Sequence, residues 1–451
     1  MNGIHDAQRL AELTALPLER KIQISQTRII EWYTHYKGNV CVAFSGGKDS
    51  TVLLHLVRQL FPDVRAVFSN TGLEYPEIRK YATSYPNVDV VSPKMRFDQV
   101  ISTYGYPLIG KEVAEAIHYA RKICRSQTGQ VERERERERE EAERTARRKK
   151  AELRGSRRIG NASKCGGGGT QTLIKTENAR SRRTILQGKW IRRAGVVKAG
   201  GTIHQESEDG TNSTDSKGGI FSEGTKSLFN KEKWLPMVYA PFLISHYCCS
   251  EMKKKPSKRY YHKNKLFPYV GTLAEESRIR RQAWIRHGCN AFEGSNPSSQ
   301  PLSFWTEQDI LAYLVRNGIE IASVYGDIVS VDADGNEYDP RSLLFGPCGS
   351  LKCTGCQRTG CIFCGFGFHL EKGETRFQRL AKTHPKQYEY SIGGGQWVDN
   401  PYYDPTAPKM DGEWENWNPK KIWVPSKKGL GMGKVFDMAN EIYGKDFYRY
   451  E

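Results

Sequence analysis

Apolar and polar positions follow a regular pattern over the first hundred or so residues of the chain. Three short runs rich in Val and other apolar residues, Val40 to Phe44, Val64 to Phe68 and Val88 to Val91, are typical of strands. Between the first two runs, Thr51 to Leu60 repeats Leu, Val and His at helical spacing. Strand, helix and strand in this order predict an α/β fold: a parallel twisted sheet with right-handed crossovers and helices on both faces.

The pattern breaks at about Gln127 and stays broken to about Ser227. This stretch begins with alternating Glu and Arg over Glu132 to Glu140 and contains four glycines at Gly166 to Gly169. Because it has few large apolar residues, we expect a charged, low-complexity insertion that is partly helical at its start and otherwise flexible. Two interpretations stay open: an arm that binds nucleic acid, or a solubilising insert, since the Glu–Arg run by itself is nearly neutral.

Helical patterning returns in the second half of the chain. Order resumes near Trp234, and Trp305 to Val315 has a helical period. Thr306 is the expected N-cap of that helix, with Asp309 in its first turn. Val435 to Tyr443 predicts a last short helix.

The charge of the chain narrows the class of partner. The chain has 451 residues, 69 Lys and Arg against 51 Asp and Glu, and a formal net charge of +18. This excess predicts either a polyanionic partner, nucleic acid or a phosphorylated small molecule, or a basic solvated surface. No apolar stretch approaches the roughly 18 residues of a membrane span, and the polar start has no signal core. The odd number of Cys, 11, favours thiols or metal ligands in a reducing cytoplasm.

A glycine turn between the first strand and its helix is the strongest local motif. In VAFSGGKDSTVLLHL, the strand runs into Ser45, Gly46 and Gly47, and the helix follows directly. The glycines let the backbone approach an anion closely, and the helix N-terminus adds amide donors and a partial positive charge. Lys48 adds a full charge, but its spacing is not that of the GxxxxGK[ST] loop. The turn therefore predicts a phosphate site of another type.

Four ordered segments resemble one family. SGGKDS resembles the PP-loop of the adenine nucleotide α-hydrolase superfamily, and within it the chain is similar to the phosphoadenosine phosphosulfate (PAPS) reductase family. FSNTGLEYPE resembles the segment usually written DTGxxFPE, with Asn70 in place of Asp. GTLAEESRIRRQAW resembles the second anion-binding segment, and PLSFWTEQDILAYL the helix that follows it. The resemblance implies Lys48 and Asp49 as catalytic residues, and as nucleotide-binding residues Ser45, Gly46, Gly47, Lys48, Asp49, Ser50, Arg278 and Arg281.

The cysteines of the second half allow two metal sites. Cys353, Cys356, Cys361 and Cys364 form a compact set that could hold tetrahedral zinc. The other solution joins Cys248 and Cys249 to Cys361 and Cys364, and this CC…CxxC pattern resembles the [4Fe-4S] site of assimilatory adenylylsulfate (APS) reductases. Free thiols are the third interpretation. The iron–sulfur interpretation is preferred, with Cys353 and Cys356 then left over.

These observations predict a division of the chain into four parts. We expect the first part of a PP-loop nucleotide-binding domain at residues 1–126, the insertion at 127–227, the second part of the domain at 228–340, and a Cys-rich metal-binding segment with a C-terminal extension at 341–451.

The resemblance implies an enzyme of sulfur chemistry that binds ATP, APS or PAPS. Family members reduce the sulfonucleotide with a Cys in a Glu-Cys-Gly-x-His tail, and the printed sequence ends KDFYRYE instead. We therefore expect another nucleophile, such as Cys353 or Cys356, or ATP-dependent sulfur transfer to tRNA or DNA. A sulfur or electron donor protein and Mg²⁺ are further expected partners. The alternative is a non-catalytic nucleotide- and nucleic-acid-binding regulatory or defence component.

Overall fold

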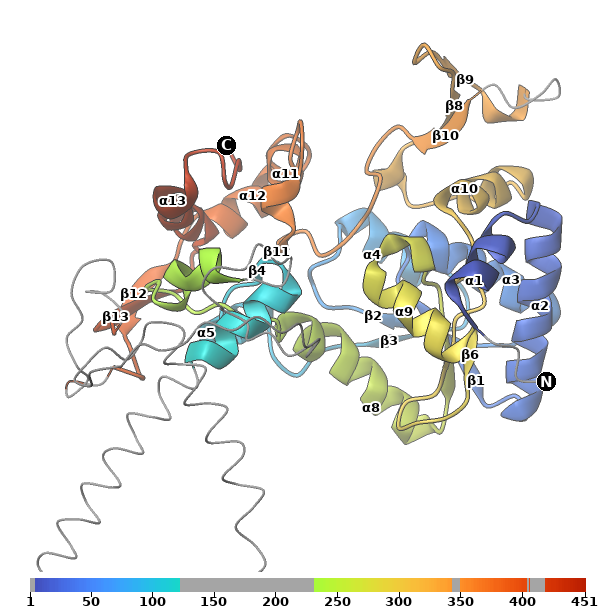
Figure 1. Cartoon of the computed structure of the whole chain (residues 1–451), viewed down its shortest axis with the longest axis horizontal. Coiled ribbons are helices and arrows are strands. Elements are labelled where there is room, and N and C mark those ends of the chain that lie inside the picture. Colours follow the sequence, from blue (N-terminus) through green and yellow to red (C-terminus); the bar gives the residue numbers. More distant parts are fainter. Residues whose placement is uncertain (1–4, 122–230, 343–348, 404, 406–417) are drawn as a thin grey trace, which may run out of the picture. The chain divides into compact units, whose positions relative to one another are not determined.

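The computed structural model describes residues 5–121, 231–342, 349–403, 405 and 418–451 (Figure 1). The chain separates into two compact units, unit 1 (Met1–Thr103, Tyr247–Cys364 and Lys382–His384) and unit 2 (Tyr104–His246, Gly365–Ala381 and Pro385–Glu451). The predicted insertion at 127–227 lies outside the described residues, as do Cys124 and Cys165. No helix in the described ranges is both long and apolar enough to cross a membrane.

Unit 1 alternates strands and helices along the chain, as the hydrophobic pattern predicts. Its helices are α1 (Ala7–Thr14), α2 (Leu18–His35), α3 (Lys48–Leu60), α4 (Pro76–Ser84), α5 (Phe97–Tyr104), α8 (Lys255–Asn264), α9 (Arg278–His287) and α10 (Glu307–Arg316). Its strands are β1 (Val40–Phe44), β2 (Ala66–Ser69), β3 (Val88–Val91), β5 (Phe267–Val270), β6 (Asn290–Ala291), β7 (Ser298–Ser299), β8 (Ile328–Val331), β9 (Glu337–Tyr338) and β10 (Ser350–Cys353). Single turns of helix occupy η2 (Ser250–Lys254), η3 (Ala274–Glu276), η4 (Ser323–Tyr325) and η5 (Pro340–Ser342).

The central sheet of unit 1 has the strand order β3-β2-β1-β5-β7-β6. Strands β3 to β7 of this order run parallel, and β6 pairs antiparallel with β7 at the edge. Strand β1 is central, because Val42 lies opposite both Ala66 of β2 and Tyr269 of β5. The predicted parallel α/β sheet is confirmed. Strand β2 begins two residues later than expected because the Val64 amide closes a turn onto the carbonyl of Phe61 (3.1 Å).

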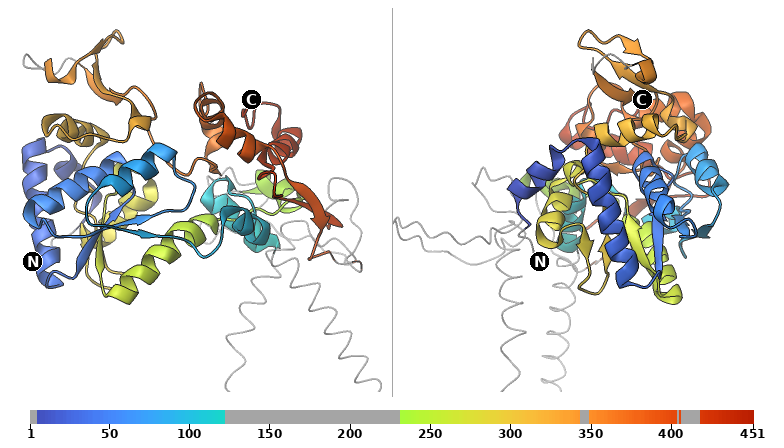
Figure 2. Two further views of the ribbon diagram at one scale, coloured as in Figure 1. Left: turned by 180° about the vertical axis from the view of Figure 1, so that it is seen from behind. Right: turned by 90° about the vertical axis from the view of Figure 1, so that its right-hand side faces the viewer.

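Helices flank both faces of this sheet (Figures 1 and 2). Helix α3 packs on β1 and is covered by α2 and α10, whereas α8 packs on β2 and β3. The right-handed rule for parallel crossovers places α3 and α8 on opposite faces, because their connections lead in opposite directions across the sheet. The core between them is apolar, and Val42, Leu53 and Leu56 have no exposed surface. This arrangement brings the carboxyl end of β1 directly to the N-terminus of α3.

The cap of α10 agrees with the sequence pattern. The hydroxyl of Thr306 accepts from the amide of Asp309, and the carboxylate of Asp309 accepts from the amide of Thr306 (2.7 Å), which forms a reciprocal capping box. Asp309 also pairs with the buried Lys21 of α2 (2.5 Å). The cap therefore fixes α10 to the N-terminal helices as well as starting it.

Unit 2 is built from small elements around an aromatic cluster. Its elements are β4 (Leu108–Ile109), η1 (Glu232–Val238), β11 (Gly365–Phe366), η6 (Phe368–Leu370), α11 (Arg376–Thr383), α12 (Pro385–Ile392), β12 (Gln396–Asp399), β13 (Lys421–Val424) and α13 (Met432–Tyr443), with a further helix from residue 111. Phe368 stacks on Tyr448 with the ring centroids 5.3 Å apart, and both rings contact Phe436 of α13. Helix α13 contains the predicted last helix and begins three residues before it.

Candidate functional site

The glycine turn lies between β1 and α3, where the sequence places it. Gly46 has φ of +72°, and a Cβ there would lie 3.0 Å from the carbonyl oxygen of Ile78, so a larger residue would be strained by its backbone conformation and by a close contact. Gly47 is the N-cap of α3 and has extended backbone. The first turn of α3 thus begins immediately after two residues that have no side chains. This leaves the helix N-terminus, with its amides and partial positive charge, available to an anion.

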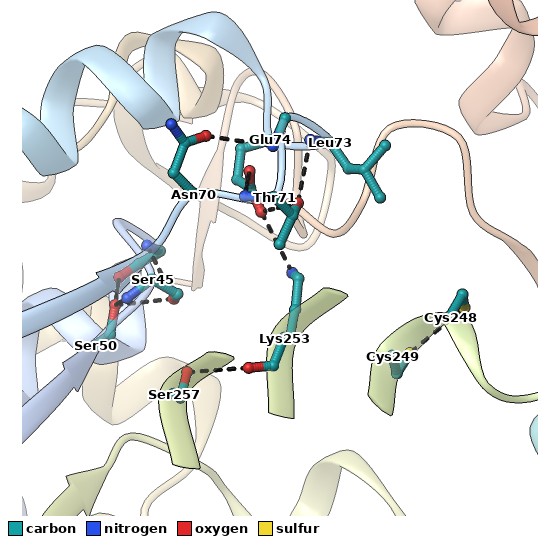
Figure 3. A network of polar contacts seen from close by, with 12 residues as sticks. Ser45, Ser50, Asn70, Thr71, Leu73, Glu74, Cys248, Cys249, Lys253 and Ser257 are labelled. Atoms are coloured by element: carbon teal, nitrogen blue, oxygen red, sulfur yellow. Dashed lines mark hydrogen bonds and ion pairs between the residues drawn. The ribbon is translucent and has the colours of Figure 1, made fainter. Parts of the chain in front are cut away.

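Two hydroxyl groups brace the turn from inside. Ser45 and Ser50 lie with their Oγ atoms 3.0 Å apart, and the amide of Ser45 donates to Oγ of Ser50 (3.2 Å; Figure 3). The Ser50 hydroxyl in turn donates to the carbonyl of Gly47 (2.9 Å). Both predicted nucleotide-binding serines therefore hold the loop in shape. Ser50 Oγ donates once and accepts from both the amide and the hydroxyl of Ser45, whereas Ser45 Oγ accepts only from the amide of Gly47 (3.3 Å) and keeps one lone pair with which to meet a ligand.

Lys48 is buried, and its ammonium group contacts two oxygen atoms from distant parts of the chain. Its Nζ lies 2.8 Å from a carboxylate oxygen of Glu307 and donates to the carbonyl of Gln357 (3.1 Å). Burial lowers the pKa of Lys48, but the negative charges of Asp49 and Glu307 outweigh that effect, so its pKa is raised overall. The ammonium therefore stays charged at neutral pH, in an environment that strengthens its attraction for an anion.

Asp49, the second residue of α3, is half-buried. Its Oδ1 atom has no hydrogen-bond partner among the described residues. Burial raises the pKa of Asp49, and the cations Lys48 and Arg358 oppose the rise. A buried acceptor left unpaired costs stability, which makes Asp49 Oδ1 a candidate position for a ligand or a proton.

A pair of arginines completes the charged group. The charges of Arg280 of α9 and Arg358 both act on Asp49, and both guanidiniums form ion pairs with Glu276. Burial, followed by the like charge of Arg358, lowers the pKa of Arg280. Two guanidiniums held close enough to repel one another form a natural anion-binding site.

The two arginines that the family resemblance selected are more exposed than Arg280. Arg278 and Arg281 are exposed on α9, whereas Arg280 is half-buried. Arg280 stands one helical turn before the buried Trp284, so it points to the inner face of the helix. The structure therefore brings Arg280, which the sequence reasoning missed, to the phosphate loop. The pattern of apolar positions around Trp284 carried that signal.

The turn after β2 forms a second polar loop. The hydroxyl of Thr71 donates to one oxygen of Glu74 (2.7 Å), and its amide donates to the other (3.0 Å; Figure 3). Asn70, which replaces the family's Asp, accepts from the amide of Gly72 (3.2 Å). An amide oxygen thus performs the turn-closing role at this position, and Glu74 supplies the carboxylate of the loop.

Four cysteine thiols gather elsewhere in unit 1. Cys248 and Cys249 lie just before η2, with their sulfur atoms 4.0 Å apart. Cys361 and Cys364 share a turn in which the amide of Cys364 donates to the carbonyl of Cys361 (3.1 Å). The pKa of Cys248 is raised, first by its hydrogen bond to Cys249 and by burial, and then by the charges of Cys364 and Cys361. The four thiols are therefore close enough to influence one another's ionisation.

Lys253 lies between this thiol group and the loop after β2. Its Nζ is 3.8 Å from a carboxylate oxygen of Glu74 (Figure 3). Burial lowers the pKa of Lys253, but the charges of Cys361 and Glu74 outweigh it and raise the pKa overall. On Cys361 burial raises the thiol pKa to about 12, and Lys253 acts against that rise. A single ammonium thus lies near the Glu74 carboxylate and acts to favour the thiolate form of Cys361.

Cys353 and Cys356 form a separate pair. Besides burial, the charges that act most strongly on Cys353 are those of Lys48, Glu307 and Asp49, followed by Cys356. The two predicted metal-ligand sets are not confirmed as sites, because the described part of the chain has no group of three or more His, Cys, Asp or Glu placed to hold a metal ion. Cys41 of β1 is fully buried and belongs to the core of unit 1.

The fold and the charged loop together define a class. A mostly parallel α/β sheet has a glycine turn and charged side chains at the carboxyl end of its central strand, where open α/β sheets commonly bind their ligands. The model of the phosphoadenosine phosphosulfate reductase domain matches residues 39–153 and 221–365, more than half of the chain. The chain therefore belongs to the phosphoadenosine phosphosulfate reductase family.

Individual relatives match over shorter stretches. An adenosine 5'-phosphosulfate reductase of Bacillus cereus is 30% identical over 87 residues, which is 18% of this chain and 37% of that protein. The protein of the same name from Bacillus mycoides is 29% identical over 87 residues, with the same shares. The chain thus spans little more than a third of the length of these relatives. The phosphoadenylyl-sulfate reductase structure from Candida auris, a phosphate complex, is 10% identical over 70% of this chain and 90% of that one, with a TM-score of 0.28.

Proposed function

We propose that this chain is a sulfonucleotide reductase that binds an adenylyl sulfonucleotide at Ser45–Ser50 and releases its sulfonyl group as sulfite. The observation that carries the proposal is the gathering of Lys48, Arg280 and Arg358 around the half-buried carboxylate of Asp49. An anhydride of phosphate and sulfate is a compact, multiply charged anion. A glycine turn with three cations and a helix N-terminus has the charge and shape to hold it.

The same groups supply transition-state stabilisation. When the bond between sulfur and the bridging oxygen breaks, negative charge develops on the departing phosphate. The amides at the start of α3, the Lys48 ammonium and the two guanidiniums are fixed before the reaction, so they stabilise that charge with little reorganisation. In the free site, Glu276 and Glu307 form ion pairs with these cations, and a bound anion would replace both carboxylates as the partner of the cations.

The donor chemistry of the thiol group fits a cysteine-ligated cluster. Cys248, Cys249, Cys361 and Cys364 would hold a [4Fe-4S] cluster, for which four thiolates are the ordinary ligands. When bound, such a cluster supplies a redox-capable iron centre. Lys253 is positioned to offset the charge of the thiolates that form it. Zinc held by Cys353, Cys356, Cys361 and Cys364 is less well supported, because the strongest influences on Cys353 come from the phosphate loop and not from Cys361 or Cys364.

The relatives named as adenosine 5'-phosphosulfate reductases support APS as the first substrate to test. Reduction of the sulfonyl group to sulfite consumes two electrons, so a dithiol electron donor is the expected partner. ATP-dependent sulfur transfer to tRNA or DNA, with Mg²⁺, is the competing reaction for the same loop.

The test is product analysis under anaerobic conditions. Purified protein is incubated separately with APS, PAPS and ATP, each with a dithiol donor and each with and without mixed tRNA and DNA. We expect sulfite from APS or PAPS. Lys48→Ala should lower that rate by about 100-fold or more because the buried charge is lost. The matched control, Lys80→Ala, removes an exposed lysine of α4 and should leave the rate unchanged.

Other products would replace the proposal. AMP and pyrophosphate from ATP, especially with stimulation by nucleic acid, would assign adenylation and sulfur transfer instead. Nucleotide binding without any turnover would assign a non-catalytic role. Full activity in Lys48→Ala would show that the phosphate loop is not the site.

A further inference from the structure

A rigid turn holds the leftover cysteine pair. The amides of Gly355 and Cys356 donate to the carbonyls of Tyr325 and Val324 (2.8 and 2.9 Å). A Cβ on Gly355 would lie 2.5 Å from the Val324 carbonyl oxygen, so the Cys-Thr-Gly-Cys turn needs its glycine. Cys353 and Cys356 are 2% and 5% exposed, although the two residues between them are exposed. The turn thus points two thiols inward at fixed positions.

This turn is joined to the phosphate loop. Lys48 donates to the carbonyl of Gln357, and the side-chain amide of Gln357 donates to the carbonyl of Cys353 (2.5 Å). Two residues after Gln357, the hydroxyl of Thr359 lies 2.5 Å from the hydroxyl of Tyr325. Both hydroxyls border Gly47, within 4 Å of the position that a Cβ would take. The cysteine turn therefore lies over the loop that would bind the nucleotide.

The charges around Cys353 suit a thiol that reacts there. Burial raises the pKa of Cys353, which keeps it protonated in the free protein, and Lys48 opposes that rise. The carboxylate of Asp49 acts on the same thiol and has an unpaired oxygen. A proton acceptor, a cation and two thiols are thus gathered beside one anion site.

We propose that Cys353 and Cys356 form the redox-active dithiol that reduces the bound sulfonucleotide, with Cys353 as nucleophile and Cys356 as resolving thiol. This inference rests on the proposed function and adds residues to it. It assigns to this chain an internal source of two electrons, distinct from the group formed by Cys248, Cys249, Cys361 and Cys364.

Two steps balance the reaction. In the first, Cys353 Sγ attacks the sulfonyl sulfur and its proton passes to Asp49. The bond between sulfur and the bridging oxygen breaks, and the nucleotide phosphate leaves with the electron pair. In the second, Cys356 Sγ attacks Cys353 Sγ, a disulfide forms, and sulfite leaves with the electrons of the former sulfur–sulfonate bond while the Cys356 proton goes to solvent. The dithiol is oxidised to a disulfide, sulfate sulfur is reduced to sulfite, and an external dithiol regenerates the pair.

A single-turnover experiment tests the assignment on the full chain. Reduced protein, freed of reductant, is mixed anaerobically with APS or PAPS. The amount of sulfite formed per chain is compared with the number of thiols lost, and peptide mapping identifies the cysteines that lost them. We expect about one sulfite per chain and one new disulfide, joining Cys353 to Cys356. In Cys356→Ser the sulfonate should stay on Cys353 as a stable mass increase of one SO₃ group. Cys353→Ser should form neither adduct nor sulfite, a loss of about 10³-fold or more.

Controls separate this inference from the function on which it rests. Cys289→Ser changes a buried thiol that lies beside Ser303 and should behave as the unmodified protein does. Nucleotide binding by Cys353→Ser, measured calorimetrically, checks that the variant is folded. Sulfite at the normal rate from Cys353→Ser, or a disulfide mapped elsewhere, would overturn the dithiol assignment alone. Absence of sulfite from the unmodified protein with both nucleotides and added dithiol would overturn the proposed function and the dithiol with it.

Discussion

The phosphate-loop edge of unit 1 and the aromatic cluster of unit 2 are both buried, yet they are built on opposite principles. The first packs Lys48, Asp49 and Arg280 into a region where each charge costs desolvation energy. The second packs uncharged rings, among them Phe368 and Phe436, against one another. Under the proposed function, burial serves binding and reactivity in the first region, whereas it serves stability in the second.

This contrast predicts opposite effects for mutations in the two regions. Truncation in the aromatic cluster should lower the free energy of unfolding and leave ligand binding by unit 1 unaffected. Truncation at the phosphate loop should do the reverse, because natural sites retain unfavourable groups that function requires.

The largest expected effect is on the stability of unit 2. Phe436→Ala removes a fully buried ring that contacts Phe368, Phe377 and Tyr448, so it should cost about 3–5 kcal/mol. Hydrogen exchange of α13 measures the loss locally, and APS binding should not change. The control is Tyr402→Ala, at an exposed ring of unit 2. Equal losses in the two variants would contradict the cluster as the core of this unit.

The second effect concerns two arginines of one helix. Arg280→Ala should weaken APS binding by about 10- to 100-fold, because a charge-assisted contact to the anion is lost. Arg278→Ala, on the exposed side of α9, should change binding less than twofold. Titration calorimetry of the two variants compares them directly. The reverse order would restore the assignment made from resemblance.

The sequence was most informative where the structural cause is local. The run of apolar residues that ends in Ser45–Gly46–Gly47 is enough to predict β1, the turn and the start of α3, because strand, glycine and helix cap follow one another in the chain. The Thr306–Asp309 cap could be predicted for the same reason. Each of these features depends on residues a few positions apart.

The partners of the buried charges could not be predicted in that way. Lys48 pairs with Glu307 and Gln357, which lie more than 250 positions further along the chain. Local spacing also allowed Cys361 to join either of two ligand sets, and only the fold assigns Cys353 to the phosphate loop. No pattern within one segment records such contacts, because the sheet topology creates them.

A smaller effect tests the loop after β2. Thr71→Val keeps the shape of the side chain but removes the hydroxyl that donates to Glu74 and accepts from the amide of Leu73. The loss should cost about 1–2 kcal/mol, measured as a lower unfolding midpoint in denaturant. Thr71→Ser, which keeps both hydrogen bonds, is the matched control. If Val and Ser variants are equally stable, this hydrogen-bond network does not hold the loop.

The smallest expected effect is a gain in the free energy of unfolding, whereas most mutations of buried groups lower it. Burial raises the pKa of Asp49 in the folded state, so ionised Asp49 destabilises the fold at pH values above that pKa, and the penalty is relieved as pH falls through it toward the unfolded value. Asp49→Asn removes the cost of the half-buried charge but also the attraction of that charge to Lys48. The free energy of unfolding at pH 7 should therefore rise by no more than about 1 kcal/mol. The gain in the free energy of unfolding should be smaller at pH 4 than at pH 7, because the pKa of Asp49 is raised in the folded state and more of the unmodified side chain is protonated at the lower pH. Denaturant unfolding at both pH values measures this. A variant less stable than the unmodified protein at pH 7 would mean that the Lys48–Asp49 attraction exceeds the cost of burial, and the phosphate loop would then resemble the aromatic cluster in being built for stability.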